Sequence, residues 1–128
     1  MRLLLDTHAF IWWDSAPDLL SPRALALCQD PENELVLSVA SLWEAQIKSQ
    51  LGRIRFDRPL LHLVEGQKQT NALTLLAVDA AHVFELDALP LVHKDPFDRM
   101  LIAQARVEKL RLLSHDTVFQ KYLVDVEW

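Results

Sequence analysis

Four carboxylates stand at positions in this sequence where they could bind a divalent cation. Asp6 directly follows the apolar run of residues 2–5, and Asp116 lies two residues beyond another apolar run. Glu44 and Asp98 lie in the first two turns of predicted helices. Four such groups held together would repel one another unless a cation lay between them, and Mg²⁺ and Mn²⁺ prefer oxygen ligands. If the four converge, the sequence predicts a metal site that can activate water for attack on a phosphodiester.

Most of these acids also have a purely structural explanation. Asp95 is a predicted helix N-cap, Pro96 suits the first helical position, and Asp98 would interact favourably with the helix dipole. Asp116 would cap a short helix that follows it. Asp6 is the hardest to explain in this way, because a buried strand does not need a carboxylate directly after it.

Glu44 has two structural explanations of its own. It completes the capping-box pattern Ser41-x-x-Glu44, although the helix is predicted to begin before Ser41, and it can pair with Lys48 one turn later. Taken singly, these acids are weak evidence for a site. Their joint placement carries the metal hypothesis, since no histidine and cysteine cluster competes for zinc and no serine–histidine–aspartate arrangement is evident.

Short apolar runs alternate along the chain with longer amphipathic ones. The predicted strands are residues 2–5, 34–37, 73–76, 112–114 and 124–126. The predicted helices are residues 9–13, 22–29, 39–51, 59–70, 79–89, 95–107 and 117–122. This alternation indicates an α/β three-layer sandwich, in which helices flank a central, mainly parallel sheet of about five strands. Such sheets place their sites at the carboxyl ends of the strands where the strand order reverses, and the four acids fall at such ends.

The composition is that of one ordinary globular domain. The chain has 128 residues, of which 51 % are hydrophobic and 24 % are charged, so we expect a single domain over residues 1–128. Cys28 is the only cysteine, which excludes an intrachain disulfide and fits a reducing cytoplasm. No segment resembles a signal peptide, and no apolar run approaches the ~20 residues that span a bilayer. We therefore expect a soluble, cytoplasmic protein.

The net charge of −5 is the main objection to a protein that acts on nucleic acid. Phosphates are normally neutralised by lysine and arginine, which are outnumbered here by aspartate and glutamate, 13 to 18. The objection weakens if several carboxylates share a divalent cation, because a bound cation reverses the local field. The charge count alone therefore does not decide the question.

Four segments resemble, in order, the motifs of the VapC toxins, which are PIN-domain ribonucleases of bacterial toxin–antitoxin pairs. They are Leu-Leu-Asp-Thr-His at 4–8, Ser-Val-Ala-Ser-Leu-Trp-Glu at 38–44, His-Lys-Asp-Pro-Phe-Asp-Arg-Met-Leu-Ile-Ala-Gln-Ala at 93–105, and Ser-His-Asp at 114–116. The similarity extends over nearly the whole chain, from residue 3 to the end. The Asp-Pro-Phe-Asp-Arg block is the most specific part of it.

The resemblance implies a PIN-like fold and an endoribonuclease that depends on Mg²⁺ or Mn²⁺ and hydrolyses phosphodiester bonds of RNA. By position, the catalytic and metal-binding acids would be Asp6, Glu44, Asp98 and Asp116. Asp95 would be an accessory acid at the same site. The resemblance also implies a homodimer and a cognate VapB-like antitoxin that blocks the site.

Several basic residues could contact phosphates of the substrate. The candidates are Lys48, Arg53, Arg55, Lys94, Arg99 and Arg106. Arg99 is the preferred one for substrate binding, because it adjoins Asp98. For most of the others a solvated surface position is the alternative.

One departure from the family pattern and one apolar run also bear on function. Ser114 stands where the family commonly has threonine, and because serine keeps a hydroxyl we expect little loss; His115 beside it is expected in a solvent-facing loop. The run Phe10 to Trp13, with Trp43 and Trp128, offers apolar area that would suit a partner helix or strand. For any one of these residues, a place in the core is the favoured interpretation.

Two other classes of protein compete with a nuclease. A PIN-like module that binds RNA or protein without catalysis would have lost the metal site, and the presence of all four acids argues against it. A phosphoacceptor signalling domain is also an α/β fold with acids at strand ends. Such domains need paired acids after the first strand and a lysine after a late strand, whereas here Asp6 is followed by Thr7 and no such lysine exists.

Overall fold

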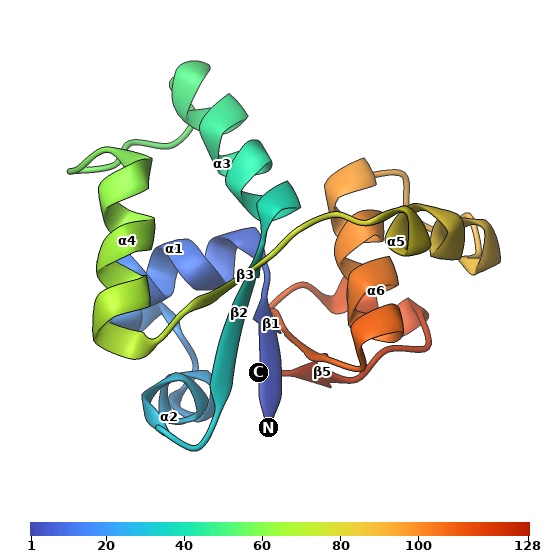
Figure 1. Ribbon diagram of the computed structural model, residues 1–128, viewed down its shortest axis with the longest axis horizontal. Helices are drawn as coiled ribbons and strands as arrows, with labels where there is room; N and C mark the ends of the chain where they lie inside the picture. Colours follow the sequence, from blue (N-terminus) through green and yellow to red (C-terminus); the bar gives the residue numbers. More distant parts are fainter.

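The computed structural model describes residues 1–128 as a sheet of five strands with helices on both faces (Figure 1). The strands are β1 (Arg2–Leu5), β2 (Glu34–Ser38), β3 (Thr74–Leu76), β4 (Arg111–Leu113) and β5 (Val126–Glu127). The α-helices are α1 (Thr7–Ser15), α2 (Pro22–Gln29), α3 (Val39–Gln50), α4 (Leu60–Asn71), α5 (Ala80–Glu85) and α6 (Pro96–Glu108). Three short 3₁₀ helices are η1 (Pro17–Leu19), η2 (Leu86–Ala88) and η3 (Thr117–Lys121). The predicted α/β fold is confirmed.

The strand order places β1 at the centre of the sheet. The order is β3-β2-β1-β4-β5, and every neighbouring pair is parallel. Leu5 at the end of β1 pairs with Leu37 of β2 on one side and with Leu113 of β4 on the other. The chain first adds strands on one side of β1 and then on the other, so the order reverses beside β1. Asp6 therefore leaves the sheet at the predicted position for a site.

Two separate apolar layers cover the two faces of the sheet. Side chains alternate along β1, so that Leu3 and Leu5 pack against Phe10 of α1, while Leu4 packs against Ile102 of α6. In Figure 1, α1, α2 and α4 lie on one side of the sheet, and α5 and α6 lie on the other. Burial on both faces explains why the strands read as continuous apolar runs rather than as alternating ones.

Helix boundaries follow the capping residues that the sequence provides. The Ser21 hydroxyl accepts a hydrogen bond from the Ala24 amide at 2.9 Å, and Pro22 begins α2, as predicted. The last strand differs from its prediction, since β5 comprises residues 126 and 127 rather than 124–126. The backbone at Val124 still turns, because its amide bonds the carbonyl of Tyr122 at 3.0 Å, and the pairing with β4 starts only after that turn.

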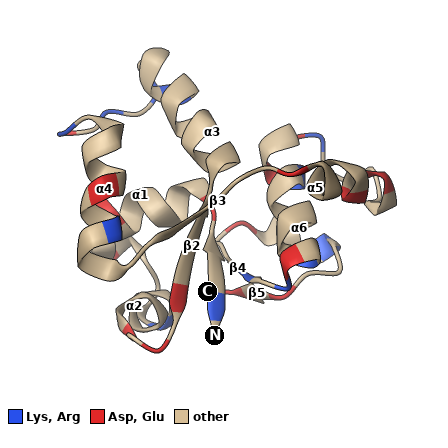
Figure 2. Ribbon diagram, viewed as in Figure 1, with Lys and Arg blue, Asp and Glu red and all other residues tan.

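None of the helices is both long and apolar enough to cross a lipid bilayer. Lysine and arginine are scattered over the ribbon rather than gathered along one helix or strand (Figure 2).

The central strand gives a test of this layering. We expect Leu4→Ala to lower the free energy of unfolding by about 2–5 kcal/mol, because the side chain is fully buried between β1 and α6 and its truncation leaves a cavity. Leu19→Ala is the control, since Leu19 lies exposed in η1, and its effect should stay within about 0.5 kcal/mol. Urea denaturation of both variants measures the difference. Equal effects would contradict the placement of Leu4.

Candidate metal centre

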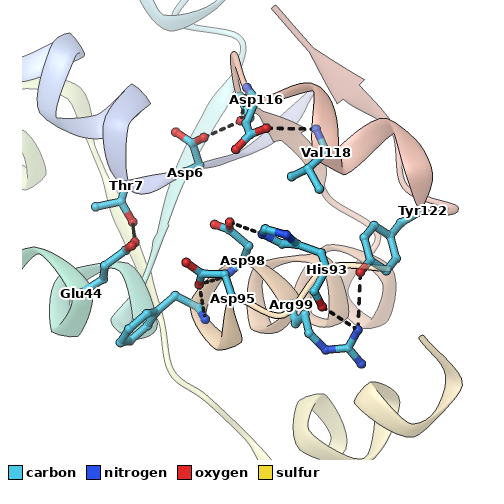
Figure 3. A network of polar contacts seen from close by, with 12 residues as sticks. Asp6, Thr7, Glu44, His93, Asp95, Asp98, Arg99, Asp116, Val118 and Tyr122 are labelled. Atoms are coloured by element: carbon cyan, nitrogen blue, oxygen red, sulfur yellow. Dashed lines mark hydrogen bonds and ion pairs between the residues drawn. The ribbon is translucent and has the colours of Figure 1, made fainter. Parts of the chain in front are cut away.

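An acidic cleft of about 600 Å³ opens at the carboxyl edge of the sheet. Its lining residues are Asp6, Thr7, His8, Trp12, Glu44, Lys48, His93, Asp95, Asp98, His115, Asp116 and Thr117. All four acids that the sequence singles out, and the accessory Asp95, therefore line one cleft. Figure 3 shows them approaching one another from β1, α3, α6 and the start of η3.

Asp6 forms the buried floor of this cleft, with only 8 % of its surface exposed. It caps α1 by accepting a hydrogen bond from the Ala9 amide at 2.7 Å, and its other oxygen accepts one from the Ser114 hydroxyl. Burial raises the pKa of Asp6; these two donors and the charge of His8 oppose the rise, and the charge of Asp116 adds to it. Asp6 therefore has a structural role as the N-cap of α1, in addition to lining the cleft. This cap was not predicted from the sequence.

Ser114 connects Asp6 to Asp116. Its hydroxyl donates to Asp6 and accepts from the backbone amide of Asp116 at 3.0 Å. Asp116 in turn caps η3, accepting from the Val118 amide at 3.0 Å, so its predicted capping role is present together with its place in the cleft. The hydroxyl of Ser114 is the group that a threonine at this position would also offer.

Glu44 is held by two partners that neutralise or solvate its charge. The Thr7 hydroxyl donates to one carboxylate oxygen at 2.5 Å, and the Lys48 ammonium lies 3.0 Å from the other. The predicted pair with Lys48 is therefore present. The capping box with Ser41 is absent, because Ser38 caps α3 by accepting from the Ala40 amide at 3.0 Å, three residues before Ser41. Glu44 consequently lies in the second turn of α3.

Asp95 and Asp98 stand together at the start of α6 (Figure 3). Asp95 is the N-cap and accepts from the amides of Phe97 at 2.9 Å and Asp98 at 3.1 Å. The Asp98 carboxylate lies 2.8 Å from Nε2 of His93. Burial, followed by the negative charges of Asp95 and Glu44, raises the pKa of Asp98 to about 6, although the hydrogen bond from His93 opposes the rise.

His93 is a residue of the site that the sequence did not single out. It lies within the most family-specific segment, five residues before Asp98, which is the one signal that pointed to it. Its imidazole, together with Asp95 and Asp98, offers ligand atoms that lie within 4.8 Å of one another.

Arg99 does not occupy the position expected of a substrate-binding residue. Its guanidinium donates to the carbonyl of Pro90 at 2.9 Å and lies 3.4 Å from the hydroxyl of Tyr122, and it does not line the cleft. The hypothesis that Arg99 contacts phosphate is therefore not supported by its placement. Among the basic candidates, Lys48 lines the cleft, whereas Arg106 pairs with Glu85 at 3.1 Å elsewhere.

The aromatic run is divided between the core and the rim of the cleft. Phe10 is buried in the core. Trp12 lines the cleft, where its ring centre lies 5.8 Å from that of His8 and 6.3 Å from that of His115. Trp43 is 64 % exposed, and it contacts Phe97 edge-on, which joins α3 to α6 beside Glu44 and Asp98.

The donor set of the cleft fits a hard divalent cation. Asp6 and Asp98 both have raised pKa values, so their charged forms lack sufficient compensation from the protein alone. Asp98 and Asp116 each use one oxygen in a hydrogen bond, and the other oxygen has no hydrogen-bond partner in the protein. A cation in this cleft would supply the missing positive charge, and carboxylate oxygens are the ligands that Mg²⁺ and Mn²⁺ prefer.

Comparison with known proteins gives one family and a set of similar structures. The family described as the PIN domain matches residues 3–123. No curated protein sequence matches the chain significantly.

Three solved structures are similar over nearly the whole chain. The VapBC2 complex of Rickettsia felis, bound to a fragment of its promoter, matches with a TM-score of 0.72 and 13 % identity, covering 99 % of this chain and 98 % of that one. A toxin–antitoxin complex from Klebsiella pneumoniae matches with a TM-score of 0.61 and 16 % identity, over 98 % and 96 %. FitAcB from Neisseria gonorrhoeae matches with a TM-score of 0.65 and 19 % identity, covering 97 % of this chain and 95 % of that one. Identities this low show a shared fold alone.

The raised pKa of Asp98 predicts how stability changes with pH without metal. Its pKa rises from 3.8 to about 6 on folding, so between these values the folded state binds more protons than the unfolded state. The free energy of unfolding therefore falls as pH rises through that window. We expect Asp98→Asn in EDTA to be more stable than the wild type at pH 7.5, by on the order of 1–2 kcal/mol, and to lose this advantage towards pH 4.

Urea denaturation at several pH values measures this effect. Asp18→Asn, at an exposed position in η1, is the control and should show no such pH-dependent gain. Adding Mn²⁺ should stabilise the wild type and leave Asp98→Asn nearly unchanged. If Asp98→Asn were less stable than the wild type at pH 7.5, the electrostatic account of the cleft would be wrong.

Proposed function

This chain belongs to the PIN-domain family, and we propose that it is the toxin of a toxin–antitoxin pair and acts as a metal-dependent endoribonuclease. The observation that carries the nuclease proposal is the convergence of Asp6, Glu44, Asp98 and Asp116, with Asp95, in one cleft. RNA is the proposed substrate because the sequence motifs resemble those of VapC toxins. The similar structures support the toxin proposal, since two of them are described as a VapBC2 complex and a toxin–antitoxin complex.

The roles of the acids follow from their partners. Asp6, Asp98 and Asp116 would hold Mg²⁺ or Mn²⁺, which supplies stabilisation of the charge that develops on the phosphodiester. Glu44 is fixed between Thr7 and Lys48, so it is placed to orient the attacking water and to accept its proton. In the hydrolysis, the water oxygen forms a bond to phosphorus and gives one proton to Glu44, while the bond to the departing ribose oxygen breaks and that oxygen takes a proton from solvent water. The Lys48 ammonium offers the substrate phosphate a positive charge at the rim.

An apolar groove supports the proposal of an antitoxin partner. It lies between α3 and α4, has a volume of about 410 Å³, and is lined mostly by apolar side chains, among them Val39, Trp43 and Leu61. Val39, Trp43 and Leu61 are all exposed, and a contiguous exposed apolar patch of this kind is typical of a surface that a partner covers. We propose that an apolar segment of the VapB-like antitoxin binds there, beside the helix that carries Glu44.

We also propose, from the family resemblance, that the chain is a single nuclease domain that forms a homodimer and works in the cytoplasm. The alternative is a PIN-like module that binds RNA or protein without cleaving it. The raised pKa of Asp98 favours the nuclease, because a binding module would gain stability by replacing this acid.

The nuclease proposal predicts metal-dependent cleavage of RNA. Purified protein, free of antitoxin, should cut a pool of cellular RNA into discrete fragments with Mn²⁺ or Mg²⁺ but not with EDTA, and single-stranded DNA of similar length should stay intact. Asp6→Asn should reduce the rate by at least about 100-fold, because it removes an anionic ligand at the floor of the cleft. Asp18→Asn should cut at the wild-type rate.

Gel electrophoresis and sequencing of the fragment ends measure the outcome. If folded wild-type protein bound RNA but cut none under any metal condition, the binding-module alternative would replace the nuclease. Cleavage that persists unchanged in Asp6→Asn would contradict the assigned site.

The antitoxin proposal predicts that a charge in the groove separates inhibition from catalysis. Leu61→Glu should weaken binding of the cognate VapB-like antitoxin by at least about tenfold, because burying the new charge is costly. RNA cleavage should stay at the wild-type rate. Leu19→Glu, an exposed leucine outside the groove, is the matched control and should bind normally. Calorimetric titration measures the affinities. Equal affinity of both variants for the antitoxin would contradict the groove as its docking surface.

A further inference from the structure

We propose, on the basis of the function proposed above, that Arg99 and His93 are positioning residues of the metal centre. Arg99 fixes the segment before α6, and His93, carried by that segment, donates the hydrogen bond that orients the Asp98 carboxylate. On this proposal, the residues from His93 to Arg99 act together to hold the Asp98 carboxylate in the cleft in one orientation.

The segment needs such an anchor because apolar packing holds only its start, where Leu89 is buried in the core. Residues 89–95, between η2 and α6, form no helix or strand. Leu91 is 90 % exposed, and Val92 is also exposed, so apolar packing does not fix the middle of the segment. The position of His93 must therefore depend on polar contacts.

Arg99 supplies these contacts from the first turns of α6. One guanidinium nitrogen donates to the carbonyl of Pro90 at 2.9 Å and lies 3.5 Å from the carbonyl of His93. The other lies 3.4 Å from the carbonyl of Leu86. The planar guanidinium carries its donors on separate nitrogens in a fixed geometry, so it can bind the carbonyls of Pro90 and Leu86 at once, whereas the single nitrogen of a lysine ammonium cannot reproduce that arrangement.

The same guanidinium also reaches the element that carries Asp116. The hydroxyl of the buried Tyr122 lies 3.4 Å from Arg99, and Tyr122 ends the 3₁₀ helix that Asp116 caps. Arg99 therefore joins the helix of Asp98, the segment of His93 and the helix of Asp116 (Figure 3). Its sequence position beside Asp98 ensures that this connection starts from the same helical turn as the acid.

His93 completes the chain of contacts at Asp98. Its Nε2 lies 2.8 Å from one Asp98 oxygen, and the second Asp98 oxygen has no hydrogen-bond partner in the protein. The hydrogen bond thus leaves one defined oxygen for a cation. Groups that orient a metal ligand in this way typically change metal affinity by about 10- to 100-fold when they are removed.

The test measures metal affinity rather than cleavage. Mn²⁺ and Mg²⁺ affinities are determined by calorimetry for the wild type, His93→Ala, His93→Gln and Arg99→Lys, with folding checked by thermal unfolding. His93→Ala should lower the affinity for both cations by about tenfold or more. His93→Gln should restore most of the affinity, because its amide nitrogen can donate from nearly the same position as Nε2. His62→Ala, at an exposed histidine of α4, should bind both cations like the wild type.

The dependence on Arg99 is tested by a double variant. Arg99→Lys should also weaken the binding of both cations, and the combination of His93→Ala with Arg99→Lys should lose less affinity than the sum of the two single losses, since Arg99 acts in part through the same hydrogen bond. Tyr122→Phe removes only one contact of Arg99 and should give a smaller loss.

Three results would overturn the inference. The first is an unchanged affinity in His93→Ala. The second is a loss of affinity in His93→Ala for Mn²⁺ alone, together with imidazole nitrogen coupling in the electron spin-echo spectrum of Mn²⁺ bound to the wild type. His93 would then be a metal ligand itself. The third is strictly additive losses in the double variant. Failure of the proposed function is distinguishable from these, since it would leave the affinity unchanged in Asp98→Asn as well.

Discussion

Five carboxylates in one cleft repel one another, and most polar contacts around the cleft offset that repulsion. Asp6 and Glu44 are both almost fully buried, and Asp6 directly follows the central strand. The Ser114 hydroxyl and the Ala9 amide stabilise its charged form, and Lys48 and His93 perform the same task for Glu44 and Asp98. The compensation is incomplete, since the pKa values of Asp6 and Asp98 are still raised. A domain that kept these acids for stability alone would be better served by neutral residues.

Most elements of the fold were predictable because they have a local signal, whereas η1 was not predicted and β5 begins two residues later than predicted. Ser21 and Pro22 mark a helix start, the apolar run of β1 marks a buried strand, and Asp95 with Pro96 marks the start of α6. The convergence of the acids was also predictable, since it follows from the general rule for parallel sheets. Two of their hydrogen-bond partners, Thr7 for Glu44 and Ser114 for Asp6, were not predictable, because these lie far away in the sequence. Thr7 and Glu44 are 37 residues apart, and Ser114 and Asp6 are 108 apart.

Arg99 shows where adjacency in sequence misleads. Consecutive residues of an α-helix point about 100° apart, so a neighbour of Asp98 on α6 need not face the same cleft. The Asp98 side chain faces Asp6, whereas the Arg99 side chain faces the preceding segment and Tyr122 (Figure 3). Lys48 is not adjacent to any of the acids in the sequence. It nevertheless lines the cleft, because it follows Glu44 by one helical turn and so lies on the same face of α3. Helical spacing therefore predicts the basic group at the site better than sequence adjacency does.

The net charge of −5 is consistent with this arrangement of charges. Lysine and arginine do not gather into a basic stripe (Figure 2). The protein therefore offers no broad positive surface to which a polyanion could bind. The cleft concentrates much of the negative charge at one point, and a divalent cation bound there would reverse the local field. Affinity for a phosphodiester would then depend on the cation more than on arginine and lysine. On this physical account, an acidic domain and a nuclease are compatible, and salt should weaken its RNA binding less than it weakens that of a basic domain.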